Sequence, residues 1–244
     1  MSQRFFVESP IVSDTATLVD AEAHHLIHVM RAGSGDQVTL FDGCGAEFSA
    51  RVAKLGRSHV ELAVLSRLEI SRELPFELTL GVALPRGDRH KWLVEKATEL
   101  GVTRLVPLVT QRSVVEPGSG AIEKLRRVVI ESAKQCGRNR LMEIERSHPW
   151  AEFLAAATVD SLRMIAHPTA EVCDPADSTL LLPAVGRPTF AAIGPEGGFT
   201  DTELADTHAE HATRISLGFT TLRIETAAVM AAGFVRMYAQ SPVK

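Results

Sequence analysis

The sequence predicts an α/β protein in two parts, a small β-rich domain over residues 1–72 and a larger domain over residues 73–244 built on a parallel sheet. Two observations lead to this prediction. Over the first seventy or so residues, short β-rich runs follow one another at tight spacing with glycine turns between them, which is the pattern of a small barrel. From Phe76 onward, strand-like and helix-like segments alternate, which is typical of a parallel sheet covered by helices on both faces.

The first part is predicted to begin with a short strand at residues 5–7. A helix over residues 20–31 follows, with Asp20 as its N-cap and Leu26, Val29 and Met30 as apolar positions. Three longer strands come next, separated by glycine turns, at residues 36–42, 46–55 and 58–66. The polar stretch 67–75 ends in proline and is interpreted as the linker.

The second part alternates strands and helices to the end of the chain. One helix has Asp88 as its N-cap and stops at Gly101, and another stops at Gly137. The predicted strands are residues 77–84, 103–109, 141–144, 162–166, 189–193 and 213–217. The predicted helices are residues 88–100, 118–136, 150–157, 200–208 and 223–238.

The amino-acid composition is that of a globular protein. The 244 residues are 45% hydrophobic and 23% charged, which is ordinary for a globular protein with a full core. Cys44, Cys136 and Cys173 are odd in number and far apart, which indicates neither a disulfide framework nor a zinc knuckle and favours a reducing, cytoplasmic setting. The first residues lack the pattern of a signal peptide, and the apolar run 226–235 is too short for a bilayer, so no membrane association is expected.

Charge alone does not decide whether the protein binds nucleic acid. The net charge of −4 and the pI near 6.1 argue against it. However, residues 124–146 carry seven basic against three acidic side chains, and residues 85–96 carry four against two. Such clusters fit either a phosphate-binding patch or ordinary solvated helix faces, and both interpretations remain open.

Residues 191–203 (AAIGPEGGFTDTE) predict a buried strand, a glycine-rich loop and then a helix. Thr200 and Glu203 have the spacing of a capping box. Ligands of open α/β sheets usually bind at such a carboxyl end of a strand, where glycines permit close approach. The dinucleotide and Walker A patterns are both absent. Glu196 within the loop would repel a phosphate, so the loop fits a neutral or cationic ligand, or is a tight turn with no ligand.

Residues 215–228 (ISLGFTTLRIETAA) again place a glycine at the end of a strand, ahead of a helix that opens with Arg223 and Glu225. Two glycine-bearing strand ends close together would form a pocket lined by backbone. The last helix is apolar nearly all round, which indicates core packing and, beyond that, a subunit interface.

The histidines indicate no metal site. His24, His25 and His28 form an HHxxH cluster, but no cysteine or carboxylate completes a zinc set. His167 stands at the end of the strand 162–166, where a lone histidine is usually structural.

The ordered set of motifs resembles the RsmE family, the 16S ribosomal RNA uridine-N3 methyltransferases. The 194–203 and 217–228 stretches match its signatures, with further matches at residues 4–7, 24–31, 35–36, 91–102, 111–113 and 131–138. Two residues depart from the family pattern in the loop before the last helix: Phe219 stands where proline is usual and Ile224 where threonine is usual.

The resemblance implies an N-terminal PUA-like β-barrel and a C-terminal SPOUT domain with a deep trefoil knot. Knots are rare exceptions to normal chain topology, so no spacing pattern predicts one. The resemblance also implies S-adenosylmethionine as the cofactor, 16S rRNA in the small ribosomal subunit as the partner, a homodimer and no metal. By analogy with the family, three knot loops, 166–169, 193–198 and 217–223, hold the cofactor. The expected cofactor-binding residues are Ala166, His167, Pro168, Ile193, Gly194, Pro195, Glu196, Gly197, Gly198, Leu217, Gly218, Leu222 and Arg223.

For the chemistry, uridine N3 must lose a proton before it attacks, so a base or a cation near the developing anion is expected. Arg223 is the candidate cation. Glu225 is a candidate to orient Arg223, to accept the proton or simply to stabilise the helix N-terminus, and Glu196 is the other candidate base. The expected RNA contacts are Arg4, His25 and Arg31 in the first domain and Arg86, Arg112, Arg138 and Arg140 in the second. Two alternatives remain: a knotted methyltransferase that acts on another rRNA or tRNA base, and a non-catalytic RNA-binding assembly factor.

Overall fold

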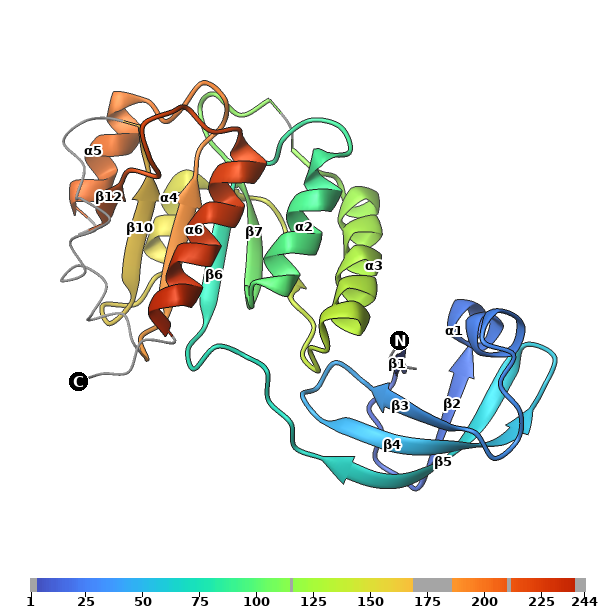
Figure 1. The fold of residues 1–244 in the computed structure, drawn as a ribbon. Coiled ribbons are helices and arrows are strands. Elements are labelled where there is room, and N and C mark those ends of the chain that lie inside the picture. Colours follow the sequence, from blue (N-terminus) through green and yellow to red (C-terminus); the bar gives the residue numbers. More distant parts are fainter. Residues whose placement is uncertain (1–3, 115, 169–185, 210–211, 240–244) are drawn as a thin grey trace. The chain divides into compact units, whose positions relative to one another are not determined.

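The computed structural model describes residues 4–114, 116–168, 186–209 and 212–239, which fall into two compact units (Figure 1). Unit 1 contains Met1–Glu73 and Ile130–Leu141, and unit 2 contains Leu74–Val129 and Met142–Lys244. The segment 130–141 therefore packs with the N-terminal unit, whereas the predicted boundary assigns it to the second domain.

Unit 1 is built on a curled five-stranded sheet in the order β1-β3-β4-β5-β2. The strands are β1 (Arg4–Phe6), β2 (Thr15–Val19), β3 (Gln37–Phe41), β4 (Glu47–Leu55) and β5 (His59–Leu68). β1 runs parallel to β3 and the other neighbours are antiparallel, with register shifts along β4 and β5 that increase the local twist. The sequence did not reveal β2, because its alternation buries only Ala16 and Leu18.

The helical segment of unit 1 differs from the prediction. Asp20 is not the N-cap: it is the first residue of α1 (Asp20–His24), Val19 occupies the cap position, and no side chain caps the helix. The segment continues as a π-helical turn, η1 (His25–Val29), in which Met30 N donates to His25 O at 2.9 Å. Asp20 and Arg31 at its two ends both have positive φ, which is uncommon outside glycine.

The segment 130–141 is held in unit 1 by buried polar contacts. Arg138 Nη2 lies 2.5 Å from Glu73 Oε2, and Asn139 Nδ2 donates to Ile70 O at 2.8 Å. Arg4 Nη2 donates to Asn139 Oδ1 at 2.7 Å, and Lys134 Nζ pairs with Glu22 at 2.6 Å. The first unit therefore takes part of its structure from residues far along the chain.

Unit 2 confirms the predicted parallel sheet. Its strand order is β12-β10-β11-β6-β7-β8, every paired neighbour is parallel, and β9 pairs with β7. The strands are β6 (Leu78–Val82), β7 (Arg104–Val109), β8 (Glu143–Ile144), β9 (His148–Pro149), β10 (Leu162–Ala166), β11 (Thr189–Ile193) and β12 (Thr213–Ile215). The helices are α2 (Arg89–Glu99), α3 (Ser119–Cys136, whose last residues belong to unit 1), α4 (Trp150–Ala155), α5 (Asp201–Ala209) and α6 (Ile224–Ala239).

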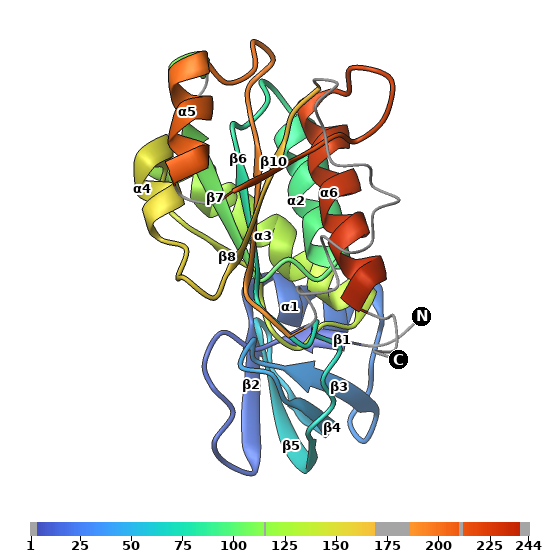
Figure 2. The same cartoon turned by 90° about the vertical axis from the view of Figure 1, so that its left-hand side faces the viewer.

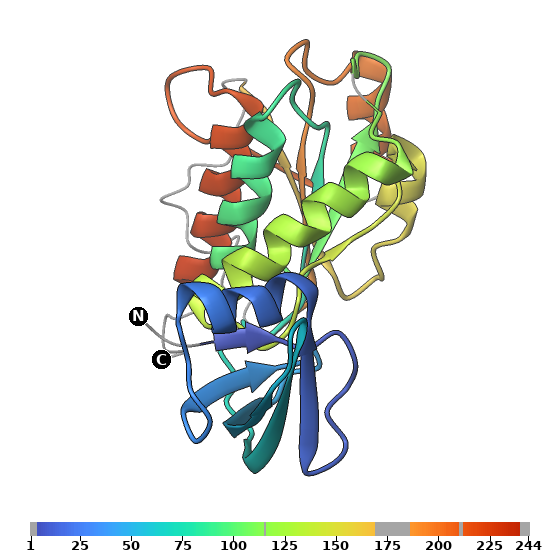
Figure 3. The same cartoon turned by 90° about the vertical axis from the view of Figure 1, so that its right-hand side faces the viewer.

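Helices cover both faces of this sheet. α2 and α6 lie side by side on one face, and α4 and α5 lie on the other (Figures 1 and 2). The second face is closed by an aromatic core in which Trp150 and Phe199 rings lie 4.5 Å apart and Phe153 packs nearby. Gly81 in β6 admits the ring of Phe153, since a Cβ there would lie 2.6 Å from it. Figure 3 shows the side opposite to that of Figure 2, with α3 in front of the sheet of unit 2.

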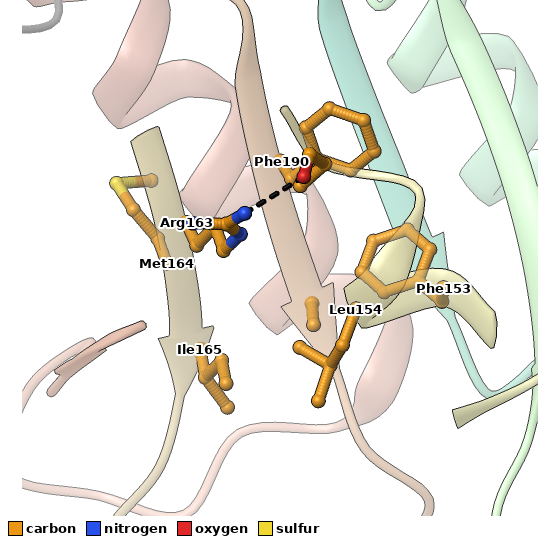
Figure 4. A pocket seen from close by; sticks show the side chains of 8 residues that line it. Phe153, Leu154, Arg163, Met164, Ile165 and Phe190 are labelled. Atoms are coloured by element: carbon orange, nitrogen blue, oxygen red, sulfur yellow. Dashed lines mark hydrogen bonds between the residues drawn. The ribbon is translucent and has the colours of Figure 1, made fainter. Parts of the chain in front are cut away.

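A small cavity opens beside this core. It is lined by apolar side chains of α4, β10 and β11 and by Arg163, whose Nη2 donates to Ala157 O at 2.7 Å (Figure 4). Its volume of about 10 Å³ is room for one water at most. A ligand of nucleoside size does not fit there, so the functional site lies elsewhere.

Candidate active site

The candidate site lies where neighbouring parallel strands end at one edge of the unit 2 sheet. Ala166, the last residue of β10, is in register with Ile193 of β11 and Ile215 of β12. His167 N extends this pairing by donating to Ile215 O at 3.0 Å. The structure thus brings the three predicted loops together at the edge where ligands of open α/β sheets bind (Figure 1). Thr169, at the end of the first loop, lies outside the described residues.

The loop 194–198 leads into α5, whose first turn is fixed by hydrogen bonds. The predicted capping box is confirmed: Thr200 N donates to Glu203 Oε2 at 2.8 Å, and Glu203 N donates to Thr200 Oγ1 at 3.3 Å. Glu203 is buried, and its other oxygen accepts from Gln111 N at 2.8 Å. This one carboxylate therefore ties the start of α5 to the segment that follows β7.

Glycine has different roles within this loop. A Cβ on Gly194 would lie 2.9 Å from the Phe199 ring, so this glycine is needed by the packing of its own loop and not only by a ligand. Gly198 has φ +69°, in the left-handed region that favours glycine. Pro195 is buried, whereas Glu196 and Gly197 are exposed.

The loop 216–223 carries the two departures from the family pattern. Gly218 has φ +122°, and a turn closes there as Ser216 Oγ donates to Gly218 O at 3.1 Å. Phe219 is fully exposed, and Ile224 is buried as the first residue of α6. Leu217 and Leu222 are half-buried in this loop.

The charged residues of the site pair differently from the prediction. Arg223 is exposed, and Glu225, buried in the first turn of α6, lies near Arg89: Arg89 Nη1 is 3.5 Å from Glu225 Oε2. Arg89 Nη2 is also 3.6 Å from Glu196 Oε1. Arg89, Glu196 and Glu225 thus form a cluster, and the expectation that Glu225 orients Arg223 stays a prediction.

Arg89 was missed as a site residue by sequence reasoning. The only signal was its membership of the basic cluster 85–96, where it did not stand out from its neighbours. It is the first residue of α2, directly after the loop that leaves β6. β6 pairs with β11, and Ala83 N donates to Ile193 O at 3.0 Å, so this loop emerges beside the loop 194–198.

His167 stands in the first loop as a half-buried imidazole. Burial, with a smaller contribution from Arg214, lowers the pKa of His167 below its usual value. A neutral ring at physiological pH adds no positive charge to the wall of the site.

The expected RNA contacts divide into accessible and buried side chains. Arg4 and Arg138 are 7% and 3% exposed and are paired with Glu47 and Glu73, so neither offers a free guanidinium to a phosphate, and both are removed from the expected contacts. Arg112 is exposed but donates to Gly197 O at 2.6 Å, within the loop that is expected to hold the cofactor.

The remaining expected RNA contacts have accessible surfaces. Arg31, Arg86 and Arg140 are exposed, and His25 is half-buried, with its ring 5.8 Å from that of Phe5. Arg140 belongs to unit 1, although it was expected in the second domain.

The described ranges contain neither a metal-binding cluster nor a helix that could span a membrane. No group of three or more His, Cys, Asp or Glu is arranged to hold a metal, and the His24 and His28 rings lie 4.7 Å apart on their own. No described helix has both the length and the apolar character that a bilayer crossing requires.

The site suits a cationic ligand that is held largely by backbone. Three loops converge on it, two of them through glycines with positive φ, so main-chain groups are brought to the ligand surface. Two carboxylates, those of Glu196 and Glu225, face the same guanidinium and give this set of three a net charge of −1. S-adenosylmethionine, with its sulfonium, fits this donor set better than a phosphate does.

Comparison with known proteins agrees with this geometry. The family described as RNA methyltransferase domain matches residues 72–236, and the one described as RNA methyltransferase PUA domain matches residues 18–65. Ribosomal RNA small subunit methyltransferase E of Synechocystis is 31% identical over 226 residues, with 91% of this chain and 72% of the relative covered. The protein of the same name from Bacillus subtilis is 27% identical over 241 residues, with 94% of each chain covered.

A solved structure extends the likeness to the whole chain. The crystal structure of ribosomal RNA small subunit methyltransferase E from Neisseria gonorrhoeae, bound to S-adenosylmethionine, has a TM-score of 0.87 at 26% identity and covers 97% of this chain and 98% of that one. The predicted PUA-like and methyltransferase parts are therefore confirmed, whereas the knot stays a prediction. The chain belongs to the ribosomal RNA small subunit methyltransferase E family.

Proposed function

We propose that the protein transfers the methyl group of S-adenosylmethionine to N3 of a uridine in the 16S RNA of the small ribosomal subunit. The observation that supports this most is the convergence of three loops at the ends of β10, β11 and β12, in a chain whose relative from Neisseria gonorrhoeae binds S-adenosylmethionine. We further propose that the enzyme acts in the cytoplasm, as a homodimer, and that the three loops form a trefoil knot.

The chain's own residues would position the cofactor and provide negative charge near its sulfonium. When bound, the cofactor supplies an electrophilic methyl group, whose transfer is an in-line displacement, so positioning accounts for much of the rate. The loops 166–168, 193–198 and 217–223 would hold it, with Glu196 and Glu225 facing its positive charge. Uridine N3 must give up its proton before it attacks, and the buried carboxylate of Glu225 or the exposed one of Glu196 is suited to accept it.

Arg223 remains a candidate for stabilising the anion that develops on the base. Its side chain is exposed directly before α6, and Arg89, not Arg223, forms the ion pairs with Glu196 and Glu225. A cation beside the developing charge would lower the barrier. Methylation rates of Arg223→Ala and Glu225→Gln test these roles, and turnover near that of the wild type in both variants would reject them.

The test of the function is mass spectrometry of 16S RNA from a strain that lacks the gene. Loss of 3-methyluridine, restored by the intact gene, is the expected result. If that nucleoside is unchanged and another methylated base in rRNA or tRNA disappears, the enzyme has a different substrate. Calorimetry with S-adenosylmethionine tests the non-catalytic alternative, which predicts no binding.

A further inference from the structure

Glu225 is a buried carboxylate, one oxygen of which has no hydrogen-bond partner among the described residues. Its side chain is 9% exposed, and its Oε2 accepts no hydrogen bond from the described residues. A buried carboxylate is costly unless a charge or hydrogen bonds compensate it. The start of α6 gives partial compensation through the helix dipole, and the nearby full positive charge is that of Arg89.

Arg89 faces two carboxylates at once. Its Nη1 lies 3.5 Å from Glu225 Oε2 and its Nη2 lies 3.6 Å from Glu196 Oε1. Both distances are longer than a normal hydrogen bond, so the contacts are electrostatic and have room to tighten when a ligand binds. Because Arg89, Glu196 and Glu225 come from the start of α2, the loop after β11 and the start of α6, one guanidinium links three separate segments of the site.

Removing this charge would have two consequences. Glu196 and Glu225 would lose the cation that offsets their mutual repulsion, so the loop and α6 would no longer be held in one arrangement. The site would also become more negative, which favours a cationic ligand over a neutral one.

We propose that Arg89 is a positioning residue of the methyl-transfer site, which holds Glu196 and Glu225 in place and balances their charge. This inference rests on the proposed function. In the reaction, the N3 proton passes to a carboxylate, N3 forms a bond to the methyl carbon, and the electron pair of the broken carbon–sulfur bond stays on sulfur. The positive charge at sulfur vanishes in this step, and the negative charge of the carboxylate is neutralised by the N3 proton. The fixed Arg89 cation disfavours the sulfonium relative to the neutral thioether product.

The experiment compares Arg89→Gln, Arg89→Lys and a control, Lys91→Gln, with the wild type. Lys91 is an exposed cation two residues further along α2 that pairs with Asp88, so its loss removes the same charge from the same helix. The measurements are calorimetric affinities for S-adenosylmethionine and for S-adenosylhomocysteine, single-turnover methylation rates, and urea unfolding. The two ligands differ by the methyl group and its positive charge, so their affinity ratio reports local charge and not general loss of structure.

For Arg89→Gln we expect a rate at least about tenfold lower and an affinity ratio shifted about fivefold toward S-adenosylmethionine. Arg89→Lys keeps the charge, so its ratio should stay within about twofold of the wild type, and it should recover most of the lost rate. If Arg89→Gln does not fold, Arg89→Lys is compared with the wild type in its place. Lys91→Gln should match the wild type in both measurements.

Three results would overturn the proposal. One is an Arg89→Gln variant that behaves like Lys91→Gln. Another is an equal loss of affinity for both ligands together with lower stability, which means that Arg89 is only structural. The third is an Arg89→Lys variant as slow as Arg89→Gln. Failure of the proposed function has a different signature, because the wild type itself would then neither bind S-adenosylmethionine nor methylate RNA.

Discussion

The guanidinium of Arg112 donates a hydrogen bond of 2.6 Å to the carbonyl oxygen of Gly197, in the middle of the candidate cofactor loop. The side chain also packs on this glycine, since a Cβ on Gly197 would lie 3.2 Å from Arg112 Cδ. Arg112 follows β7 and Gly197 follows β11, with β6 between the two strands. A residue expected to contact RNA thus supports the loop expected to hold the cofactor.

Replacing Arg112 with glutamine should weaken cofactor binding. The exposed hydrogen bond from a charged donor is worth about 1 kcal/mol, so calorimetry should show S-adenosylmethionine bound about fivefold more weakly. Arg126→Gln, which removes an exposed arginine on α3, is the matched control. The opposite result would show that Arg112 contacts RNA. In that case the cofactor affinity would be unchanged, and the slope of log affinity for RNA against log salt concentration would fall by about one.

Arg138→Ala should destabilise the protein strongly. Arg138 is 3% exposed and makes two contacts with Glu73, at 3.1 Å from Nε and 2.5 Å from Nη2. Breaking a buried pair leaves one charge uncompensated, so the free energy of unfolding should fall by about 3–5 kcal/mol, measured by urea denaturation. Arg140→Ala, at an exposed neighbour, should change it by less than about 0.5 kcal/mol. Equal stabilities for the two variants would contradict this account.

The buried carboxylate of Glu203 should contribute to the stability of the protein. Its oxygens accept from Gln111 N and Thr200 N, both at 2.8 Å, so Glu203→Ala leaves two backbone donors without their acceptor. We expect the free energy of unfolding to fall by about 2–3 kcal/mol and Glu203→Gln to lose less, because its amide oxygen still accepts one bond. Chemical denaturation of both variants, beside an exposed substitution such as Asp206→Ala, provides the check. A Glu203→Ala variant as stable as this control would show that the hydrogen bonds of Glu203 do not contribute to stability.

Sequence patterns could predict the parts of this molecule whose physics is local. The strands at 162–166 and 189–193 are short, mainly apolar runs and were predicted to the residue, and the Thr200–Glu203 capping box is a contact three residues apart. The π-helical turn at His25–Val29 was beyond such reasoning, because its apolar spacing resembles that of an α-helix.

The pairing of the charges was also out of reach. Arg89, Glu196 and Glu225 meet because β6 lies beside β11 in the sheet and α2 packs against α6, adjacencies that the order of segments along the chain does not encode. For the same reason, Arg4 and Arg138 read as surface cations in the sequence, while their acidic partners lie 43 and 65 residues away. Such distant partners lie beyond the reach of any local sequence pattern.

His167 should make stability depend on pH in a specific direction. Burial first, and Arg214 second, lower the pKa of His167 from the ordinary value of 6.5. As the pH falls through 6.5, the unfolded chain binds a proton that the folded chain does not yet bind, so the folded state loses stability. The loss is complete below the folded pKa. Above pH 7 the ring is neutral in both states and contributes no pH dependence.

The comparison that isolates this effect is the free energy of unfolding of the wild type minus that of His167→Gln, measured in urea from pH 8 to pH 5. The other histidines are common to both proteins and cancel in the difference. The difference should be flat above pH 7 and should fall as the solution becomes more acidic. S-adenosylmethionine binding should weaken in the same acid range for the wild type but less so for the variant, because a protonated imidazole in the loop 166–168 would repel a cationic ligand. A difference that rises toward acid pH would mean that the folded protein stabilises the imidazolium, contrary to the burial that we assign to this ring.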